Sequence, residues 1–162
     1  MAGQNTIERC GEVTEETLQS VFGHLSTQGV ALEGMILKPN MVLPGLRCPT
    51  QATVDEVAHA TIGSLLRVVP AAVPGIAFLS GGQSSELATA RLNAMNVIAK
   101  TPTSRSPWPL TFSFARAIQQ PALEIWGGQE SRTSAAQDAL AHRASCNRAA
   151  LRGEYTPEME RT

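Results

Sequence analysis

The pattern of apolar positions along the chain predicts three strands, each followed by a helix, after one N-terminal helix. In that first helix, Thr14–Glu16 can cap and charge the start, and Gln28–Gly29 ends it. Its apolar side chains recur at helical spacing: Leu18, Val21, Phe22 and Leu25. Residues 31–42 are then predicted to form a buried strand, because they are mostly branched or apolar and Pro39 stops the ladder.

A second helix and strand lie on either side of a proline-rich break. Thr53 and Glu56 have the spacing of a capping box and open the helix. The apolar run 74–80 predicts a short strand, and the helix after Gly81–Gln83 begins near Ser84. The positions at helical spacing along this helix are Leu87, Ala90, Arg91, Ala94 and Met95.

The third strand is expected over 109–114 and runs directly into a helix that Pro121 interrupts. Ser134 and Gln137 are expected to cap a last amphipathic helix, which ends near Gly153.

Three strand-helix units with nearly continuous apolar strands predict an α/β fold, in which helices cover a parallel sheet. A doubly wound sheet and an eight-stranded barrel both fit this pattern. In either fold the site lies beyond the carboxyl ends of the strands. Lys38, Ser80–Gly82 and Ser113–Arg116 all fall there.

Composition narrows the classes of function. The chain is 43% hydrophobic and 17% charged with a net charge of −1, so we expect one soluble domain without a nucleic-acid or membrane partner. Cys10, Cys48 and Cys146 are odd in number and widely spaced, which favours free thiols in the cytoplasm and no metal site. Residues 1–10 lack the apolar core of a secretory signal, and the apolar stretch 65–79 is too interrupted to cross a bilayer.

Lys38 is the first candidate for chemistry. It is one of two lysines, against eleven arginines, and stands at the end of an apolar strand. Burial disfavours the protonated form of an amine, so a buried Lys38 would be a nucleophile near neutral pH, as Schiff-base chemistry requires. The alternative is a lysine whose stem packs on the strand while its ammonium group reaches water.

A phosphate site is the second candidate. Residues 80–83, Ser-Gly-Gly-Gln, join a strand to the start of a helix, where free N–H groups and a hydroxyl face one point. Arg116 follows the third strand and would add a guanidinium group there. Each feature alone has a plainer interpretation, namely an ordinary tight turn and a surface ion pair.

Four motifs occur in order along the chain: LEGMILKPNMV at 32–42, FLSGGQS at 78–84, LNAMN at 92–96 and WPLTFSFARA at 108–117. Together they resemble class I fructose-bisphosphate aldolases, and the resemblance extends over about residues 8–155. The pattern FARAIQQ at 114–120 is more similar to the bacterial branch of that family.

The resemblance implies a (β/α)8 barrel enzyme of glycolysis. Such a lyase cleaves fructose 1,6-bisphosphate to dihydroxyacetone phosphate and glyceraldehyde 3-phosphate, without a metal or another cofactor. By this resemblance Lys38 forms the Schiff base, and Ser80, Gly81, Ala115 and Arg116 bind the ketose phosphate. Ala115 stands where many animal members have glycine, but its N–H group remains.

The resemblance also implies that part of the barrel is represented. A whole barrel needs roughly 250 residues. The sequence contains the last three strand-helix units and the C-terminal helices. Residues 1–162 are therefore expected to form a single domain, the C-terminal portion of a barrel, with a disordered start over 1–7 and a tail over 155–162. Open sheet edges predict a homo-oligomer or other association.

Two functional hypotheses follow. In the first, the chain is an aldolase that carries the Schiff-base lysine and the ketose-phosphate site. In the second, it is a non-catalytic remnant that binds phosphate weakly or pairs with an aldolase subunit, because the family's acid-base carboxylate lies in the unmatched half. Another Schiff-base barrel, such as a transaldolase, fits the four motifs less well.

Overall fold

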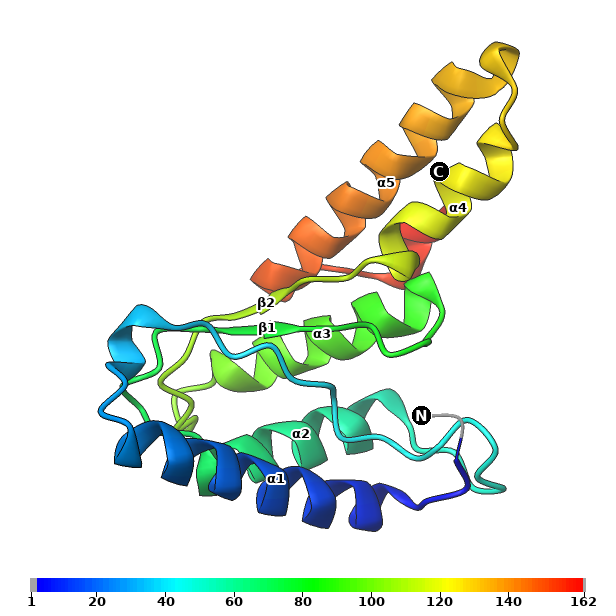
Figure 1. The fold of residues 1–162 in the computed structure, drawn as a ribbon. Coiled ribbons are helices and arrows are strands. Elements are labelled where there is room, and N and C mark those ends of the chain that lie inside the picture. Colours follow the sequence, from blue (N-terminus) through cyan, green and yellow to red (C-terminus); the bar gives the residue numbers. More distant parts are fainter. Residues whose placement is uncertain (1–2, 162) are drawn as a thin grey trace.

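A computed structural model describes residues 3–161 and shows helices packed against a small parallel sheet (Figure 1). The helices are α1 (Ile7–Thr27), α2 (Val54–Val68), α3 (Ser85–Ala99), α4 (Arg116–Trp126) and α5 (Thr133–Arg152). The strands are β1 (Ile76–Phe78) and β2 (Leu110–Phe112), and the short 3-10 helices are η1 (Leu32–Gly34), η2 (Glu130–Arg132) and η3 (Pro157–Arg161).

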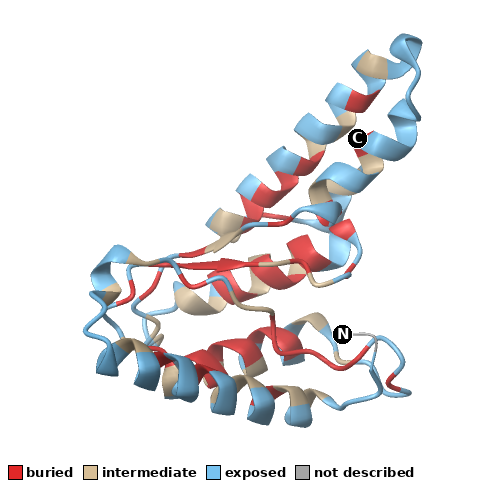
Figure 2. Cartoon of the chain, viewed as in Figure 1, coloured by how far each residue is buried: buried red, intermediate tan, exposed pale blue. Residues whose placement is uncertain are grey.

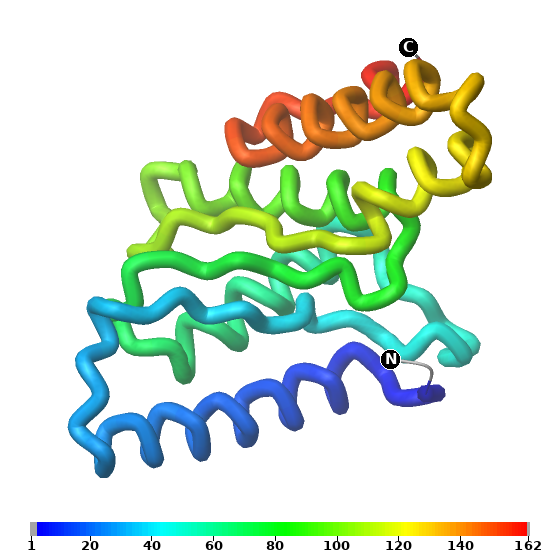
Figure 3. The backbone as a smooth tube through the Cα atoms, turned by 45° about the horizontal axis from the view of Figure 1, so that its top comes forward, coloured from blue at the N-terminus to red at the C-terminus, as the bar shows by residue number. Residues whose placement is uncertain are grey.

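β1 and β2 pair in parallel, with Ile76 opposite Leu110 and Phe78 opposite Phe112. Leu37 makes a single parallel bridge to Ile76. The segment around Leu37, β1 and β2 therefore lie side by side in that order (Figure 3). The predicted α/β class and the parallel arrangement are confirmed.

The strand expected over 31–42 is wrong for most of its length. Its first part contains η1, and Leu37 alone makes a bridge. Pro39 has no N–H group to donate, so the ladder stops there, although the carbonyl oxygen of Pro39 still accepts a hydrogen bond from Leu79 N at 3.1 Å.

α1 begins at Ile7, well before the expected start at Thr14. Thr6 is the N-cap, and its hydroxyl oxygen accepts a hydrogen bond from Arg9 N at 3.3 Å. The hydroxyl of Thr14 instead donates to Cys10 O at 2.7 Å, a bond that threonine commonly makes inside a helix.

The expected cap of the last helix by Ser134 and Gln137 is also wrong. α5 begins at Thr133, directly after η2, and Arg132 occupies the N-cap position without a side-chain bond. Because η2 already turns the chain helically, α5 continues from it and needs no capping side chain. The end is as predicted, since Gly153 takes the left-handed conformation with φ 69°.

The stretches expected as a disordered start and a tail both include residues that contact the rest of the fold. Near the start, Gly45 N donates to Asn5 O at 2.9 Å. Near the end, Tyr155 is buried and η3 follows it. Residues 1–2 and 162 of these expected segments lie outside the described residues.

One hydrophobic core fills the space between the helices and the sheet (Figure 2). α3 packs against α2, α5 and β2, and α1 packs on α2. Burying each large core side chain contributes roughly 1.5–3 kcal/mol to stability. The largest fully buried apolar side chains are Phe78, Met41, Leu65, Ile76, Leu92 and Met95.

Two further findings concern the chain as a whole. Within residues 3–161, every helix is too short or too polar to cross a bilayer. Cys10, Cys48 and Cys146 are free thiols, as predicted.

Candidate active site at the strand ends

The three parallel segments end at one edge of the sheet. Ala77 N donates to Leu37 O, and Ser113 N donates to Phe78 O, both at 2.8 Å, so neighbouring segments stay paired up to their carboxyl ends. The candidate residues follow these ends directly. They are Lys38 after the first segment, Ser80 and Gly81 after β1, and Ala115 and Arg116 after β2.

Lys38 lies on the sheet face away from the core. Successive residues of an extended segment point to opposite faces. Leu37 is 8% exposed in the core, whereas Lys38 is exposed. Ile36 shares the face of Lys38 and is 58% exposed. Of the two alternatives for Lys38, a buried amine and an ammonium group that reaches water, the structure therefore has the second, because the face that carries Lys38 is open.

The glycines after β1 form a tight turn. Gly81 and Gly82 have φ values of 63° and 84°, a left-handed conformation that two successive side-chain-bearing residues would adopt only with strain. The turn brings Gln83 N to Ser80 O, to which it donates at 3.1 Å. Ser80 is buried, and Ser84 caps the helix that follows.

A buried side-chain network holds this turn in place. Gln83 Nε2 donates to Ser80 O at 2.8 Å, and Arg91 Nη1 donates to Gln83 Oε1 at 2.8 Å. Arg91 Nη2 also donates to Ala52 O at 3.2 Å. Burial lowers the pKa of the Arg91 guanidinium, but arginine still carries its charge at neutral pH, so these acceptors are needed.

This network was not predicted, although the sequence holds a signal for it. Arg91 stands among Leu87, Ala90, Ala94 and Met95 at helical spacing on α3. A charged residue on an apolar helix face requires a buried partner.

The start of α4 lies at the same edge. Ala115 is its N-cap, without a capping side chain, and the first N–H groups of a helix have no acceptor within the helix. Both Ala115 and Arg116 are exposed. A Cβ atom placed on Gly82 would lie 3.8 Å from Arg116 Nη2, so the guanidinium group stands close to the glycine turn.

A hollow of about 450 Å³ lies between the glycine turn and α4. Gly82 and Arg116 line it, together with the carboxylate side chains of Glu86 and Glu124. Its charge is therefore mixed, and Lys38 is not part of its lining. The candidate residues share an edge without being enclosed in one cavity.

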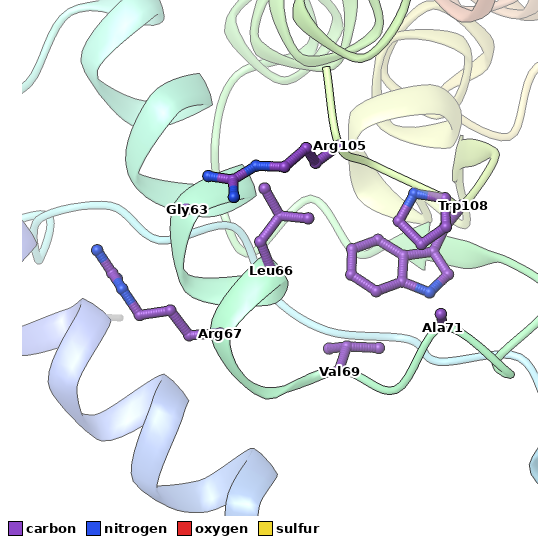
Figure 4. Close-up of a pocket in the computed structure, with 8 residues that line it drawn as sticks. Gly63, Leu66, Arg67, Val69, Ala71, Arg105 and Trp108 are labelled. Atoms are coloured by element: carbon purple, nitrogen blue, oxygen red, sulfur yellow. The ribbon is translucent and has the colours of Figure 1, made fainter. Parts of the chain in front are cut away.

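A second hollow, of about 490 Å³, lies near the amino ends of the strands (Figure 4). Arg105 and Trp108 line it from the segment before β2, and Trp108 Nε1 donates to Pro70 O at 3.2 Å. Arg67, also in the lining, pairs with Glu15 at 2.5 Å. Because parallel sheets place their sites beyond the carboxyl ends, we do not assign the chemistry to this hollow.

Parallel strand-helix units with candidate site residues at the carboxyl edge fit both a doubly wound sheet and an α/β barrel. The family model for "Fructose-bisphosphate aldolase class-I" matches residues 1–162, and the chain belongs to this family. The resemblance seen in the four motifs is thereby confirmed.

Several known aldolases are similar to the chain. Fructose-bisphosphate aldolase B from Gallus gallus is 50% identical over 153 residues, covering 94% of this chain and 41% of that enzyme. The aldolase from Dictyostelium discoideum is 44% identical over 158 residues, covering 98% of this chain and 43% of that enzyme.

A solved structure agrees with these sequences. The aldolase from Plasmodium falciparum, in complex with TRAP and a small-molecule inhibitor, superimposes with a TM-score of 0.88 at 44% identity. That match covers 95% of this chain and 43% of the Plasmodium chain. The 162 residues thus span about two-fifths of the length of these relatives, as the partial barrel predicts.

Proposed function

We propose that these residues form the ketose-phosphate part of a class I fructose-bisphosphate aldolase site. Lys38 Nζ attacks the ketone carbon of the sugar phosphate, water leaves, and a protonated imine results. The imine then accepts the electron pair released when the carbon–carbon bond breaks. Ser80, Gly81, Ala115 and Arg116 bind the phosphate of the ketose.

The observation that carries the proposal is the common edge at which Lys38, the glycine turn and the start of α4 lie. A phosphate there receives N–H groups from the start of α4 and the charge of Arg116, which the helix dipole reinforces. Arg116 Nη2 already stands close to Gly82. Binding of the phosphate would hold the ketone carbon of the same substrate close to the amine of Lys38.

Complete cleavage of fructose 1,6-bisphosphate needs more than an imine. A positioned acid and base must move protons, and water must be excluded from Lys38. We infer that further barrel strands supply these groups and cover the open face, since the chain spans 41–43% of its relatives. The proposal includes no metal and no separate cofactor, a sugar phosphate as the ligand, and the cytoplasm as the location of a glycolytic enzyme.

The second hypothesis, a non-catalytic remnant that binds phosphate weakly or associates with an aldolase subunit, is favoured by one observation. Lys38 and Ile36 are exposed on an open sheet face. Water has free access to the Lys38 amine on this face, whereas covalent catalysis favours a site from which water is excluded.

Borohydride trapping tests the assignment of Lys38. Dihydroxyacetone phosphate with borohydride should label Lys38 at a low level, whereas the chain alone should cleave fructose 1,6-bisphosphate at or near background. Lys38→Arg should remove the label, because a guanidinium group is no nucleophile. Lys100 is the only other lysine, so Lys100→Arg is the matched control and should keep the label. Labelling of Lys100 in the parent chain would contradict the assignment.

Complementation separates the two hypotheses. The chain can be co-expressed with the part of the Gallus gallus enzyme that lies outside the match. Turnover that appears only with both parts, and that disappears with Lys38→Arg, supports the enzyme. A stable complex without turnover supports the non-catalytic partner.

A further inference from the structure

His142, Cys146 and Glu160 form a compact group outside the candidate active site. His142 and Cys146 lie one turn apart on α5, and Glu160 comes from η3, which folds back along α5 (Figure 3). His142 Nε2 lies 3.6 Å from Cys146 Sγ and 3.7 Å from Glu160 Oε2. The three potential ligand atoms are within 4.8 Å of one another.

Two of these separations are close to those of a tetrahedral zinc site. Zinc binds nitrogen and oxygen at about 2.1 Å and thiolate sulfur at about 2.3 Å, so neighbouring ligand atoms stand about 3.4–3.6 Å apart. The distances from His142 Nε2 to Cys146 Sγ and to Glu160 Oε2, 3.6 and 3.7 Å, need only small side-chain adjustments to reach these values. Imidazole, thiolate and carboxylate together are a ligand set that suits zinc.

The carboxylate of Glu160 is held in place by two donors. Tyr155 Oη donates to Glu160 Oε1 at 2.8 Å, and Arg143 Nη1 donates to Glu160 Oε2. Each carboxylate oxygen has two acceptor sites, so Oε2 keeps one for a metal ion. Such outer partners orient a ligand before the ion binds.

The exposure of the three side chains and the charges around them also affect whether a zinc ion can bind. Cys146 is 1% exposed, whereas the side chains of His142 and Glu160 are 29% and 18% exposed, so an ion can reach the group from the surface. The positive charge of Arg143 opposes a cation, but a thiolate and a carboxylate together exceed that charge. Arg143 also donates to Thr89 Oγ1 at 2.9 Å and does not depend on Glu160 alone.

We propose that His142, Cys146 and Glu160 bind one zinc ion, with water as the fourth ligand. On binding, the Cys146 thiol loses its proton to solvent and the S–Zn bond forms. The ion ties η3 to α5 and stabilises the C-terminal part of the fold. None of the three residues lies at the strand-end edge, so the site is separate from the aldolase chemistry.

Zinc binding by the chain tests this site directly. We expect one equivalent of zinc per chain, a rise in the thermal midpoint, and an X-ray absorption spectrum with one sulfur at about 2.3 Å. Cobalt in place of zinc should show a thiolate charge-transfer band. Binding without sulfur, or no binding above a chelator blank, would overturn the proposal.

Two variant pairs localise the ion. His142→Asn and Cys146→Ala should each weaken zinc binding by at least about tenfold. Mutation of a residue that only hydrogen-bonds to a metal ligand already lowers metal affinity by about that factor. His59→Asn and Cys48→Ala are the matched controls and should bind zinc normally, since both residues lie outside the group. His142 is partly exposed, so its variant should fold, which circular dichroism checks. Equal losses in the controls would show that the bound zinc is elsewhere.

Discussion

Leu37 and Lys38 are adjacent in sequence but lie on opposite faces of the sheet, with Leu37 8% exposed in the core and Lys38 exposed. Leu37 anchors the segment by its bridge to Ile76, and this anchor sets the direction of the Lys38 side chain. In a barrel of eight strands the faces away from the helices meet in a packed interior. The open face around Lys38 and Ile36 is the part of that interior which these 162 residues leave uncovered.

We predict that dihydroxyacetone phosphate raises the thermal midpoint of the chain and that Arg116→Ala removes most of this shift. At a ligand concentration of 100 times Kd the stabilisation would be about 2.7 kcal/mol. The variant would lose most of the shift because Arg116 supplies the positive charge beside Gly82. Differential scanning fluorimetry with increasing ligand measures the effect.

Arg105→Ala is the matched control for this measurement. Arg105 is an exposed arginine at the amino edge of the sheet, so its loss should leave the ligand-induced shift unchanged. If Arg116→Ala kept the full shift, or if both variants lost it equally, Arg116 would not belong to a phosphate site.

Gln83→Leu is expected to lower both stability and phosphate binding. The change removes the acceptor of Arg91 Nη1 and the donor to Ser80 O, and it leaves a buried charge with fewer partners. Such a loss costs about 1–3 kcal/mol. Urea denaturation measures the stability, and the ligand-induced thermal shift measures the state of the turn.

Gln120→Leu serves as the control, because Gln120 is exposed and its side chain donates to the exposed Glu124 on the same helix. Its stability should stay within about 0.5 kcal/mol of the parent chain. Gln83→Leu with unchanged stability and ligand response would mean that the network does not support the turn.

Local signals in the sequence predicted two helix ends correctly, although the caps expected at Thr14 and at Ser134 are not formed. The capping box of α2 is present because Thr53 and Glu56 make both bonds within one turn of chain. Gly153 ends α5 because a glycine adopts the left-handed conformation without a Cβ penalty. Neither feature depends on distant residues.

Features that depend on distant partners were predicted less well. The apolar character of 31–42 signals burial, but the extent of a ladder depends on the strands that pair with it. The burial of Lys38 likewise requires atoms from other strands. The Gln83–Arg91 bond joins residues that are brought together by the turn and α3, so spacing alone did not reveal it. The sequence motifs identified the candidate site residues. That these residues bind phosphate stays a prediction.

The capping box should make stability depend on pH. Hydrogen bonds from the Thr53 N–H and then from its hydroxyl hold the pKa of Glu56 below its ordinary value of 4.5. The stabilisation is therefore present above the ordinary pKa and is lost as pH falls through the lowered one. Glu56→Gln should unfold at a lower temperature than the parent chain at neutral pH, and the two midpoints should converge as the pH falls below 4.5 and through the lowered pKa of Glu56.

Thermal melts across this pH range check the prediction, with Glu124→Gln as the control. Glu124 is an exposed carboxylate on α4 outside the capping box, so its variant should follow the parent chain at every pH. A constant gap between the Glu56 variant and the parent chain across the range would show that ionisation of Glu56 is not the cause.

The open sheet face should drive self-association of the chain. Ile36 is 58% exposed beside Lys38, and the segment around Leu37 lies at the outside of the sheet with one neighbour, β1, among the described strands. Unpaired edges template pairing with another chain, and a charge on the open face opposes it.

Light scattering coupled to size exclusion should show a mass that rises with concentration, and Ile36→Glu should return it to the monomer. Leu123→Glu replaces an apolar residue of similar exposure, 52%, on α4 and should leave the association unchanged. A monomer at all concentrations would argue against an open barrel face, whereas dissociation by Leu123→Glu alone would place the interface on α4.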